Sequence, residues 1–276
     1  MRISTWNLQG LDTHSLVKDL HSYNIDIACI QETHLRGTDS LELDNTYTLY
    51  YTGPENSSKH GIGIVIKKNC LAKFKRIDDR VCQIEVELDK LIENSKDINK
   101  NKKLTVISAY APTLTNSQKN PIVADNFYNS LQQTVNLIPN KNLLYIGIDA
   151  NAQIGLGYIN YPGSVGTFGK GYLNSNGERL GEFLVNNKLI ATNTLFNHKF
   201  CHRTTWTHPN INPNFIDKRS GTPRRNPIRN QIDYIITRIN HRPDITNSRS
   251  YAGTTHNSDH RLVINTVHAD VLAAIP

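Results

Sequence analysis

Leu143-Leu144-Tyr145-Ile146-Gly147-Ile148-Asp149-Ala150-Asn151 is the stretch of this chain that decides its fold. A short run of apolar residues and one glycine is typical of a strand buried on both faces, and it ends abruptly in polar residues. The aspartate and the asparagine lie two residues apart, so both side chains can face the same side where the strand ends. Either residue alone also fits an Asx turn.

Polar residues stand at the ends of four other strand-like runs. Asp233 begins an otherwise apolar run and needs a partner, because an unpaired buried charge is costly. His260 is the candidate, since an imidazole that an aspartate holds cationic can stabilise a charged, phosphorane-like transition state. Carboxylates, amides and an imidazole at one edge of a sheet indicate hydrolysis of a phosphodiester with a hard metal ion. The four groups are Trp6-Asn7, Gln31-Glu32, Gln231-Ile232-Asp233 and Ser258-Asp259-His260.

Residue chemistry suggests roles for several of these side chains. Glu32, where a strand leaves the core, can bind a divalent cation, and Asp259 can bind metal or water. Asp149 can hold or deprotonate a water, while the amide of Asn151 donates to a phosphate oxygen. Tyr110 can offer its hydroxyl to a phosphate. Structural alternatives remain open: surface strand ends often carry glutamate, and Tyr110 also fits a wedge before a proline.

Positive charge is concentrated near the C-terminal end of the chain. Residues 1–198 hold 20 Lys and Arg against 19 Asp and Glu, whereas residues 199–276 hold 11 against 5. A basic loop rich in proline and glycine is not regular structure and suits a polyanion, although a solvated insertion is the alternative. Its cationic residues are Lys218, Arg219, Arg224, Arg225 and Arg229.

Length and composition favour one domain inside a cell. With 276 residues and no linker-like stretch, we expect a single domain over residues 1–270 and a tail over 271–276. No apolar run is long enough for a membrane span, and the N-terminus opens into a strand pattern instead of a signal peptide. The four cysteines form no CxxC pair, so we expect reduced, mostly buried thiols. They are Cys29, Cys70, Cys82 and Cys201.

Strand patterns outnumber helical patterns along the chain. Helices are expected from about residue 13, after Pro121, and from Ser175, which forms a predicted capping box with Glu178. Many strands interleaved with fewer helices favour a mixed α/β sandwich. Residues 94–103 are expected to form an exposed hairpin loop. The predicted strands are residues 2–7, 25–31, 61–66, 81–88, 104–110, 143–148, 189–193, 231–237 and 260–267.

Six motifs, taken in their order along the chain, resemble the endonuclease/exonuclease/phosphatase superfamily. The match extends from residue 3 to about residue 267. Two further segments, residues 169–180 and 204–209, are similar to the endonuclease domain of non-LTR (LINE-type) retrotransposons. The six motifs are Thr5-Trp6-Asn7, Gln31-Glu32-Thr33, Ala109-Tyr110-Ala111-Pro112, Gly147-Ile148-Asp149-Ala150-Asn151, Gln231-Ile232-Asp233-Tyr234 and Ser258-Asp259-His260.

The resemblance implies a deoxyribonuclease-I-like fold, a four-layer α/β sandwich in which two packed β-sheets are flanked by helices. It also implies an enzyme that nicks one strand of double-stranded DNA in the nucleus and leaves a 3′ hydroxyl and a 5′ phosphate. A reverse transcriptase fused to such a domain uses the 3′ hydroxyl as its primer.

By motif, the resemblance also assigns roles. Glu32 would bind Mg²⁺ (or Mn²⁺) with help from Asn7 and Asp259. Asp149 would align and activate the water, and Asn151 would hold that water and a phosphate oxygen. His260, oriented by Asp233, would stabilise the transition state, and Tyr110 would contact the phosphate. Thr205 and Ser258 match positions near the substrate, and residues 197–203 and 209–229 are candidate loops for reading the target.

Several other activities share this catalytic inventory. Secreted deoxyribonuclease-I-like enzymes would be expected to show a signal peptide and disulfide-spaced cysteines. Inositol-phosphate phosphatases and sphingomyelinases do not obviously need the arginine-rich loop. Repair-type abasic-site endonucleases often carry an acidic residue where this chain has Gln9, so one tightly bound ion is expected here and strong abasic-site activity is not. A catalytically silent DNA-binding module is the remaining alternative.

Overall fold

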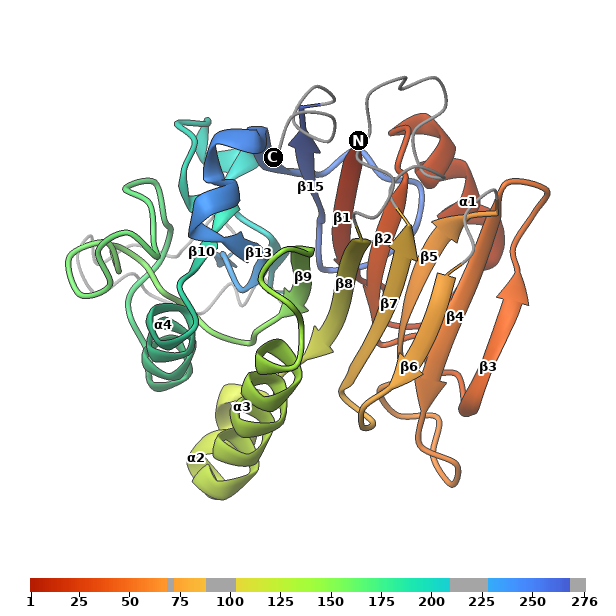
Figure 1. The fold of residues 1–276 in the computed structure, drawn as a ribbon, viewed down its shortest axis with the longest axis horizontal. Helices are drawn as coiled ribbons and strands as arrows, with labels where there is room; N and C mark the ends of the chain where they lie inside the picture. Colours follow the sequence, from red (N-terminus) through yellow and green to blue (C-terminus); the bar gives the residue numbers. More distant parts are fainter. Residues whose placement is uncertain (69–71, 88–102, 209–227, 269–276) are drawn as a thin grey trace, which may run out of the picture.

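Two large β-sheets form the centre of the protein in a computed structural model that describes residues 1–68, 72–87, 103–208 and 228–268. The first sheet has seven strands in the order β14-β15-β1-β2-β5-β4-β3, and the second has six in the order β10-β13-β9-β8-β7-β6. A separate two-stranded ribbon pairs β11 with β12. Figure 1 shows the two sheets between α1 on one side and α3 and α4 on the other.

Strands of the first sheet are β1 (Arg2–Asn7), β2 (Ile27–Gln31), β3 (Gly37–Glu42), β4 (Tyr47–Gly53), β5 (Ile62–Lys67), β14 (Ile245–Tyr251) and β15 (Leu262–Val267). Those of the second are β6 (Ala72–Arg76), β7 (Val81–Glu87), β8 (Lys103–Tyr110), β9 (Leu143–Asp149), β10 (Leu189–Ala191) and β13 (Asp233–Arg238). The ribbon consists of β11 (Trp206–Thr207) and β12 (Arg229–Asn230). The α-helices are α1 (Thr13–Ser22), α2 (Leu114–Lys119), α3 (Pro121–Asn136) and α4 (Ser175–Asn186), and short 3-10 helices cover Thr192–Thr194, Phe200–His202 and Ile239–Asp244.

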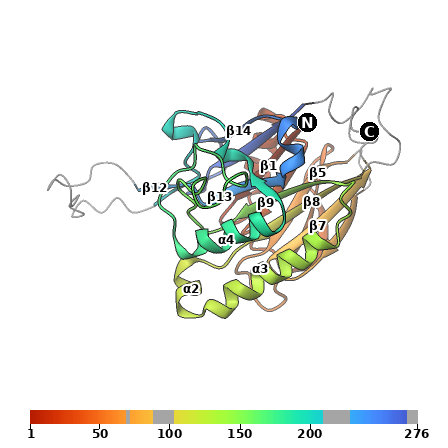
Figure 2. The ribbon, with the colours of Figure 1, turned by 60° about the vertical axis from the view of Figure 1, so that its left-hand side comes forward.

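Three apolar clusters give the predicted four layers. One lies between the sheets, a second lies between the first sheet and α1, and a third lies between the second sheet and the pair α3 and α4. In Figure 2, α3 and α4 run along the same side of the second sheet. The sequence-based expectation of two packed sheets flanked by helices is therefore confirmed.

The sheets approach closely at Gly147 in β9. A Cβ atom at this position would lie 2.5 Å from Cβ of Cys29 in the facing β2, so only glycine fits there.

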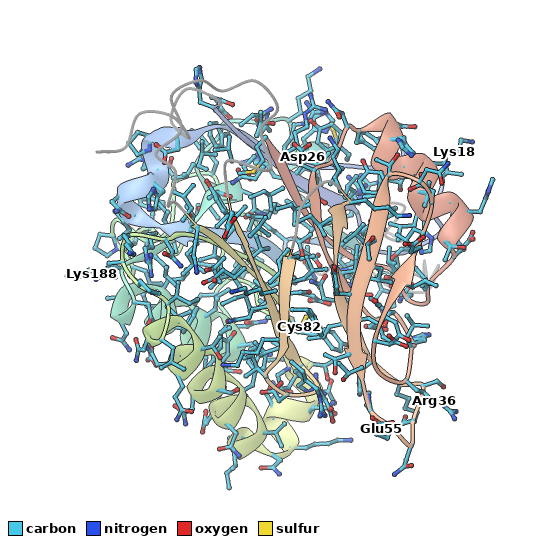
Figure 3. All side chains as sticks on the ribbon, turned by 45° about the vertical axis from the view of Figure 1, so that its right-hand side comes forward. Lys18, Asp26, Arg36, Glu55, Cys82 and Lys188 are labelled. Atoms are coloured by element: carbon cyan, nitrogen blue, oxygen red, sulfur yellow. The ribbon has the colours of Figure 1, made fainter. Side chains whose placement is uncertain are left out.

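Cys29 and Cys82 are buried between the sheets, and burial raises the pKa of the Cys29 thiol to about 12. Figure 3 labels Cys82, which lies on β7. Cys201 is exposed, so two of the three described cysteines are buried, in line with the expectation of mostly buried thiols.

Helix ends follow local hydrogen-bonding chemistry. The side chain of Asp12 caps α1 by accepting from the backbone N–H of His14, and Pro121 is the first residue of α3. At α4 the predicted capping box is wrong. Asn174 is the N-cap and accepts from Gly177 N, so Ser175 is already inside the helix.

Several elements differ from the sequence-based expectation. Strands β3, β4, β6, β11, β12 and β14 and helix α2 were not predicted. Arg229 lies in β12 instead of an irregular loop, and residues 192–194 form a 3-10 helix after β10. The predicted loop at 94–103 lies, except for its last residue, outside the described residues, as do Cys70, the tail at 271–276 and four of the five basic-loop residues. No helix within the described ranges is both long and apolar enough to cross a membrane.

Candidate active site

Strand register brings the predicted catalytic residues to one end of the sandwich. In the first sheet, parallel pairing of β1 with β2 sets Asn7 opposite Gln31. In the second sheet, Asp149 stands between Tyr110 on β8 and Asp233 on β13. In Figure 3, Asp26 marks the start of β2, and Arg36 and Glu55 lie at the opposite end, the one from which Glu32 emerges.

Tight loops follow these strand ends. Five non-glycine residues around the site adopt left-handed backbone conformations, which are uncommon outside glycine and concentrate at functional sites. Backbone hydrogen bonds hold the loops together: Gly10 N donates to Glu32 O, and His34 N donates to His60 O. The left-handed residues are Gln9, Glu32, His34, His60 and Asn151.

Glu32 uses its two carboxylate oxygens differently. Oε1 accepts from Asn7 Nδ2 at 2.8 Å and from the Tyr110 hydroxyl at 2.7 Å. Burial by itself raises the pKa of Glu32, but these two hydrogen bonds, together with the nearby His260 and His34, outweigh it and lower the pKa below its ordinary value. Oε2 accepts no hydrogen bond from the described residues and lies 3.7 Å from His34 Nε2. The carboxylate is therefore ionised, with one oxygen open to a ligand.

Asn7 connects Glu32 to Asp149. Its Nδ2 donates to Glu32 and also to Asp149 Oδ2 at 2.9 Å, while its Oδ1 accepts from the backbone N–H of Gln9. Because Oδ1 faces a backbone donor, the orientation of this amide is fixed. Asn7 was predicted to help bind the metal; in this arrangement its amino group donates to both carboxylates and bridges them.

Asp149 is almost fully buried and is surrounded by polar groups. Its Oδ1 accepts from the backbone N–H of Asn151, and its Oδ2 lies 3.9 Å from His260 Nε2. Burial and the neighbouring carboxylate of Asp233 raise the pKa of Asp149 to about 7. A carboxylate with a pKa in this range can accept a proton near neutral pH.

His260 is paired with Asp233, as the sequence predicted. Its Nδ1 lies 3.0 and 3.1 Å from the two oxygens of the Asp233 carboxylate, which is fully buried. Burial alone lowers the pKa of His260, but Asp233 and Asp149 outweigh it and raise the pKa to about 10. The imidazole is therefore a cation at neutral pH, and its Nε2 faces the site between Asp149 and Asp259.

The donor set fits a hard divalent cation. Glu32 offers an open carboxylate oxygen, and Asp259 Oδ1 is buried without a hydrogen-bond partner among the described residues. Asp149, Asp233 and His260 also offer atoms within 4.8 Å of one another. In that group, however, Asp233 and His260 already satisfy each other. Glu32 Oε2 is thus the best available ligand for Mg²⁺ or Mn²⁺.

Several other residues that were predicted to contact the substrate or the metal instead form hydrogen bonds within the protein or lie outside the described residues. Thr205 is buried, and its hydroxyl accepts from the backbone N–H groups of Ile232 and Asp233, so it supports the strand that carries Asp233 instead of facing a substrate. Ser258 donates to Asn7 O and accepts from His260 N. Asp259 accepts from Trp206 Nε1 at 3.0 Å. Arg229 lies at the base of the β11–β12 ribbon, and Lys218, Arg219, Arg224 and Arg225 lie outside the described residues.

The structure also gives roles to residues for which the sequence suggested none. Buried Gln31 ties the two sheets together beneath Glu32, because its Nε2 donates to Thr5 Oγ1 and Ser108 Oγ. Arg80 donates to Tyr110 O, and its guanidinium lies 5.3 Å from the centre of the Tyr110 ring. Burial raises the pKa of the Tyr110 hydroxyl, so it remains a neutral donor. For these residues, the only signal that the sequence offered was the position of Gln31 next to Glu32.

Comparison with known proteins identifies relatives over nearly the whole chain. The model of the endonuclease/exonuclease/phosphatase family matches residues 4–260. Craniofacial development protein 2 of Bos taurus is 32% identical over 268 residues, which make up 95% of this chain and 40% of that protein. The chain thus spans about two fifths of the length of the curated relatives it matches.

Solved structures share the fold at low identity. The endonuclease domain of TRAS1, a telomere-specific non-LTR retrotransposon, has a TM-score of 0.62 at 15% identity, covering 96% of this chain and 97% of that domain. The catalytic domain of Xenopus laevis APE2 has a TM-score of 0.64 at 16% identity, covering 97% and 91%. These similarities confirm the deoxyribonuclease-I-like fold.

Proposed function

The chain belongs to the endonuclease/exonuclease/phosphatase family, and we propose that it is a divalent-metal-dependent endonuclease that nicks one strand of double-stranded DNA. One observation carries this proposal. The Asn7 amide bridges an ionised, ligand-accepting Glu32 and Asp149, and Asp149 in turn lies beside the cationic His260. A cation ligand, a base and an electrophilic stabiliser are the three groups that phosphodiester hydrolysis needs.

Each residue has a role set by its environment. A divalent ion held by Glu32 would supply positive charge to the phosphate and its leaving oxygen. Asp149, with a pKa near neutrality, orients the attacking water and accepts its proton. His260 stays protonated and donates from Nε2 to the phosphoryl oxygens, where negative charge develops. Products are a 5′ phosphate and a 3′ hydroxyl.

A retrotransposon endonuclease is the finer form of the proposal. Residues 169–180 and 204–209 resemble that group, and the fold matches the TRAS1 endonuclease domain. In this role the nick would supply a 3′ hydroxyl primer to a reverse transcriptase of the same element, in the nucleus. The relatives named craniofacial development protein 2 are compatible with a second setting, in which the same domain serves a host protein.

Abasic-site repair is the competing function. In its favour, the fold matches the catalytic domain of APE2 and an AP endonuclease of Leishmania major. Gln9 argues against it, because its side chain accepts from the backbone N–H of Asp259 and brings no carboxylate to the Glu32 corner. One cation site therefore fits this chain better than two.

Nicking of supercoiled plasmid by purified protein tests the proposal. We expect open circles in the presence of Mg²⁺ and none with EDTA, and a DNA polymerase should extend the new ends without prior phosphatase treatment. Asp149→Ala and His260→Ala should each lower the rate by about 10²- to 10³-fold. Asp39→Asn, at an exposed position of β3, is the control and should keep the parental rate.

Two results would overturn this assignment. Preferential incision of a duplex carrying one abasic analogue over intact plasmid would favour repair. DNA binding without metal-dependent nicking would identify a catalytically silent module.

A further inference from the structure

The start of α4 lies against the loop that carries Asn151. Asn176, in the first turn of the helix, is only 2% exposed. Its Nδ2 donates to Asn151 O at 3.0 Å and to Pro112 O at 3.1 Å. Both acceptors are carbonyl oxygens, so the amide nitrogen must face them. The Asn176 side chain therefore links the loop after β9 to the loop after β8. Tyr110 is the last residue of β8.

Neighbouring residues of the same turn hold the same loop. Asn174 Oδ1 accepts from Gln153 N at 3.2 Å, and Asn174 N donates to Gln153 O at 3.1 Å. Gly177 allows the helix to come this close, because a Cβ atom there would lie 2.1 Å from Gln153 O. Residues 174–177, which we call the 174–177 clamp, thus contact both ends of the segment from Asn151 to Gln153.

Asn151 needs such support because its backbone is left-handed, with φ of 46°. A conformation of this kind in a non-glycine residue persists only where the surroundings hold it. On the strand side, Asn151 N donates to Asp149 Oδ1 and Asn151 Nδ2 donates to Ala111 O. On the helix side, Asn176 holds the carbonyl of Asn151. The clamp thus holds the backbone of Asn151 from the helix side, while Ala111 O holds its side chain from the strand side.

We infer that Asn176 is a positioning residue for catalysis, which acts by fixing Asn151 relative to Asp149 and Tyr110. The inference rests on the proposed nuclease function, with Asn151 in the role that its motif implies, which is to hold the attacking water and a phosphate oxygen. Small displacements of such a group reduce the chemical step more than substrate binding. It also gives a reason for the sequence Asn174-Ser175-Asn176-Gly177: each of its two amides and its glycine has a specific contact with the catalytic loop.

Asn176→Ala removes both hydrogen bonds and is compared with Asn142→Ala. Asn142 is also 2% exposed, and its Nδ2 donates to Thr105 Oγ1 at the other end of the second sheet. For Asn176→Ala we expect kcat for plasmid nicking to fall at least about tenfold while KM for DNA stays within about twofold. Amide hydrogen exchange should become faster in peptides covering residues 110–113 and 150–154. Asn142→Ala should lower stability without either effect.

Asn176→Asp provides a second test if the alanine variant folds poorly. It keeps the size of the side chain but places an acceptor against two carbonyl oxygens, so the same loss of kcat is expected. Parental kcat in either folded variant, or an equal loss in Asn142→Ala, would overturn the inference. If the parent itself does not nick DNA, the proposed function fails, and faster exchange at 150–154 in Asn176→Ala alone decides whether the clamp positions this loop.

Discussion

Replacing Asp233 by asparagine tests how the site keeps His260 protonated. The substitution keeps the size of the side chain but removes the carboxylate that contributes most, of the three that raise the pKa of the imidazole. Asp233 is fully buried, and both of its oxygens lie within 3.1 Å of His260 Nδ1. Few other contacts of Asp233 change, since its backbone N–H still donates to Thr205.

The magnitude follows from the pKa of His260, which is about 10 in place of the ordinary 6.5. Loss of a close opposite charge shifts a pKa by about 1–3 units, and each unit corresponds to about 1.4 kcal/mol. We therefore expect the alkaline limb of the nicking rate to move from about pH 10 to between about pH 7 and 9. At pH 8 between about 10% and about 90% of the imidazole then stays protonated, so the rate should fall by up to about tenfold.

Stability should change in the same pH window. Because the pKa of His260 is higher in the folded state, its stabilising contribution is complete below about pH 6.5 and is lost as the pH rises through 10. Asp233→Asn should flatten this dependence. Initial nicking rates and urea unfolding, both measured from pH 6 to 10.5, give the two profiles.

Two control variants separate this effect from general damage. Asp244→Asn breaks another buried His–Asp contact, between His241 and Asp244 at 3.1 Å, in a 3-10 helix that follows the far end of β13. It should cost stability and leave the pH–rate profile unchanged. Asp259→Asn removes a more distant carboxylate, 3.7 Å from His260 Nε2, and should move the limb less. An alkaline limb of Asp233→Asn that coincides with the parent's would refute the argument.

Three further predictions concern the metal, the DNA and the sheet interface. Tyr110→Phe removes the 2.7 Å hydrogen bond to Glu32, and should weaken Mg²⁺ binding by about 10- to 100-fold in titration calorimetry; an unchanged affinity would show that this bond does not tune the ligand. Arg229→Ala combined with Arg261→Ala removes two neighbouring cations beside the site, and should reduce the slope of log affinity for duplex DNA against log salt by about 0.9 per lost phosphate contact. A slope equal to the parent's would place these cations away from DNA. Gln31→Leu leaves buried hydroxyls of Thr5 and Ser108 without their amide donor, and should lower the free energy of unfolding by about 1–3 kcal/mol in urea, whereas exposed Gln118→Leu should not.

Strands of the core could be predicted because their pattern is local. β2, β5, β8 and β9 are largely apolar runs, and these strands, together with β1 and β7, were expected within two residues of their observed bounds. The edge strands of the first sheet, β3 and β14, gave no such signal. β3 is almost entirely exposed, and β14 alternates buried serines with polar residues, because both lie at sheet edges.

Pairs within the site were predictable to the extent that chemistry demanded them. A carboxylate in an apolar strand required a partner, and His260 was found at that place. The position of Thr205 was not predictable, because its hydroxyl is used by backbone N–H groups 27 and 28 residues away. The role of Asn7 was not predictable either, because it depends on the amide oxygen, and not the amide nitrogen, facing Gln9 N. Loop geometry sets this orientation, and no motif encodes it.

Asp149 and His260 differ in their affinity for a proton, and this difference assigns the role of base to Asp149 and the role of acid to His260. Asp149 and His260 lie 3.9 Å apart, yet the pKa of the first is raised to about 7 and that of the second to about 10. Between these values the proton stays on the imidazole while Asp149 is ionised, so an acid and a base coexist at one phosphate. Asp233 makes this possible, because it compensates the imidazolium from the buried side and leaves Nε2 facing the site. Without it, the two groups would share a single proton and neither role would be defined.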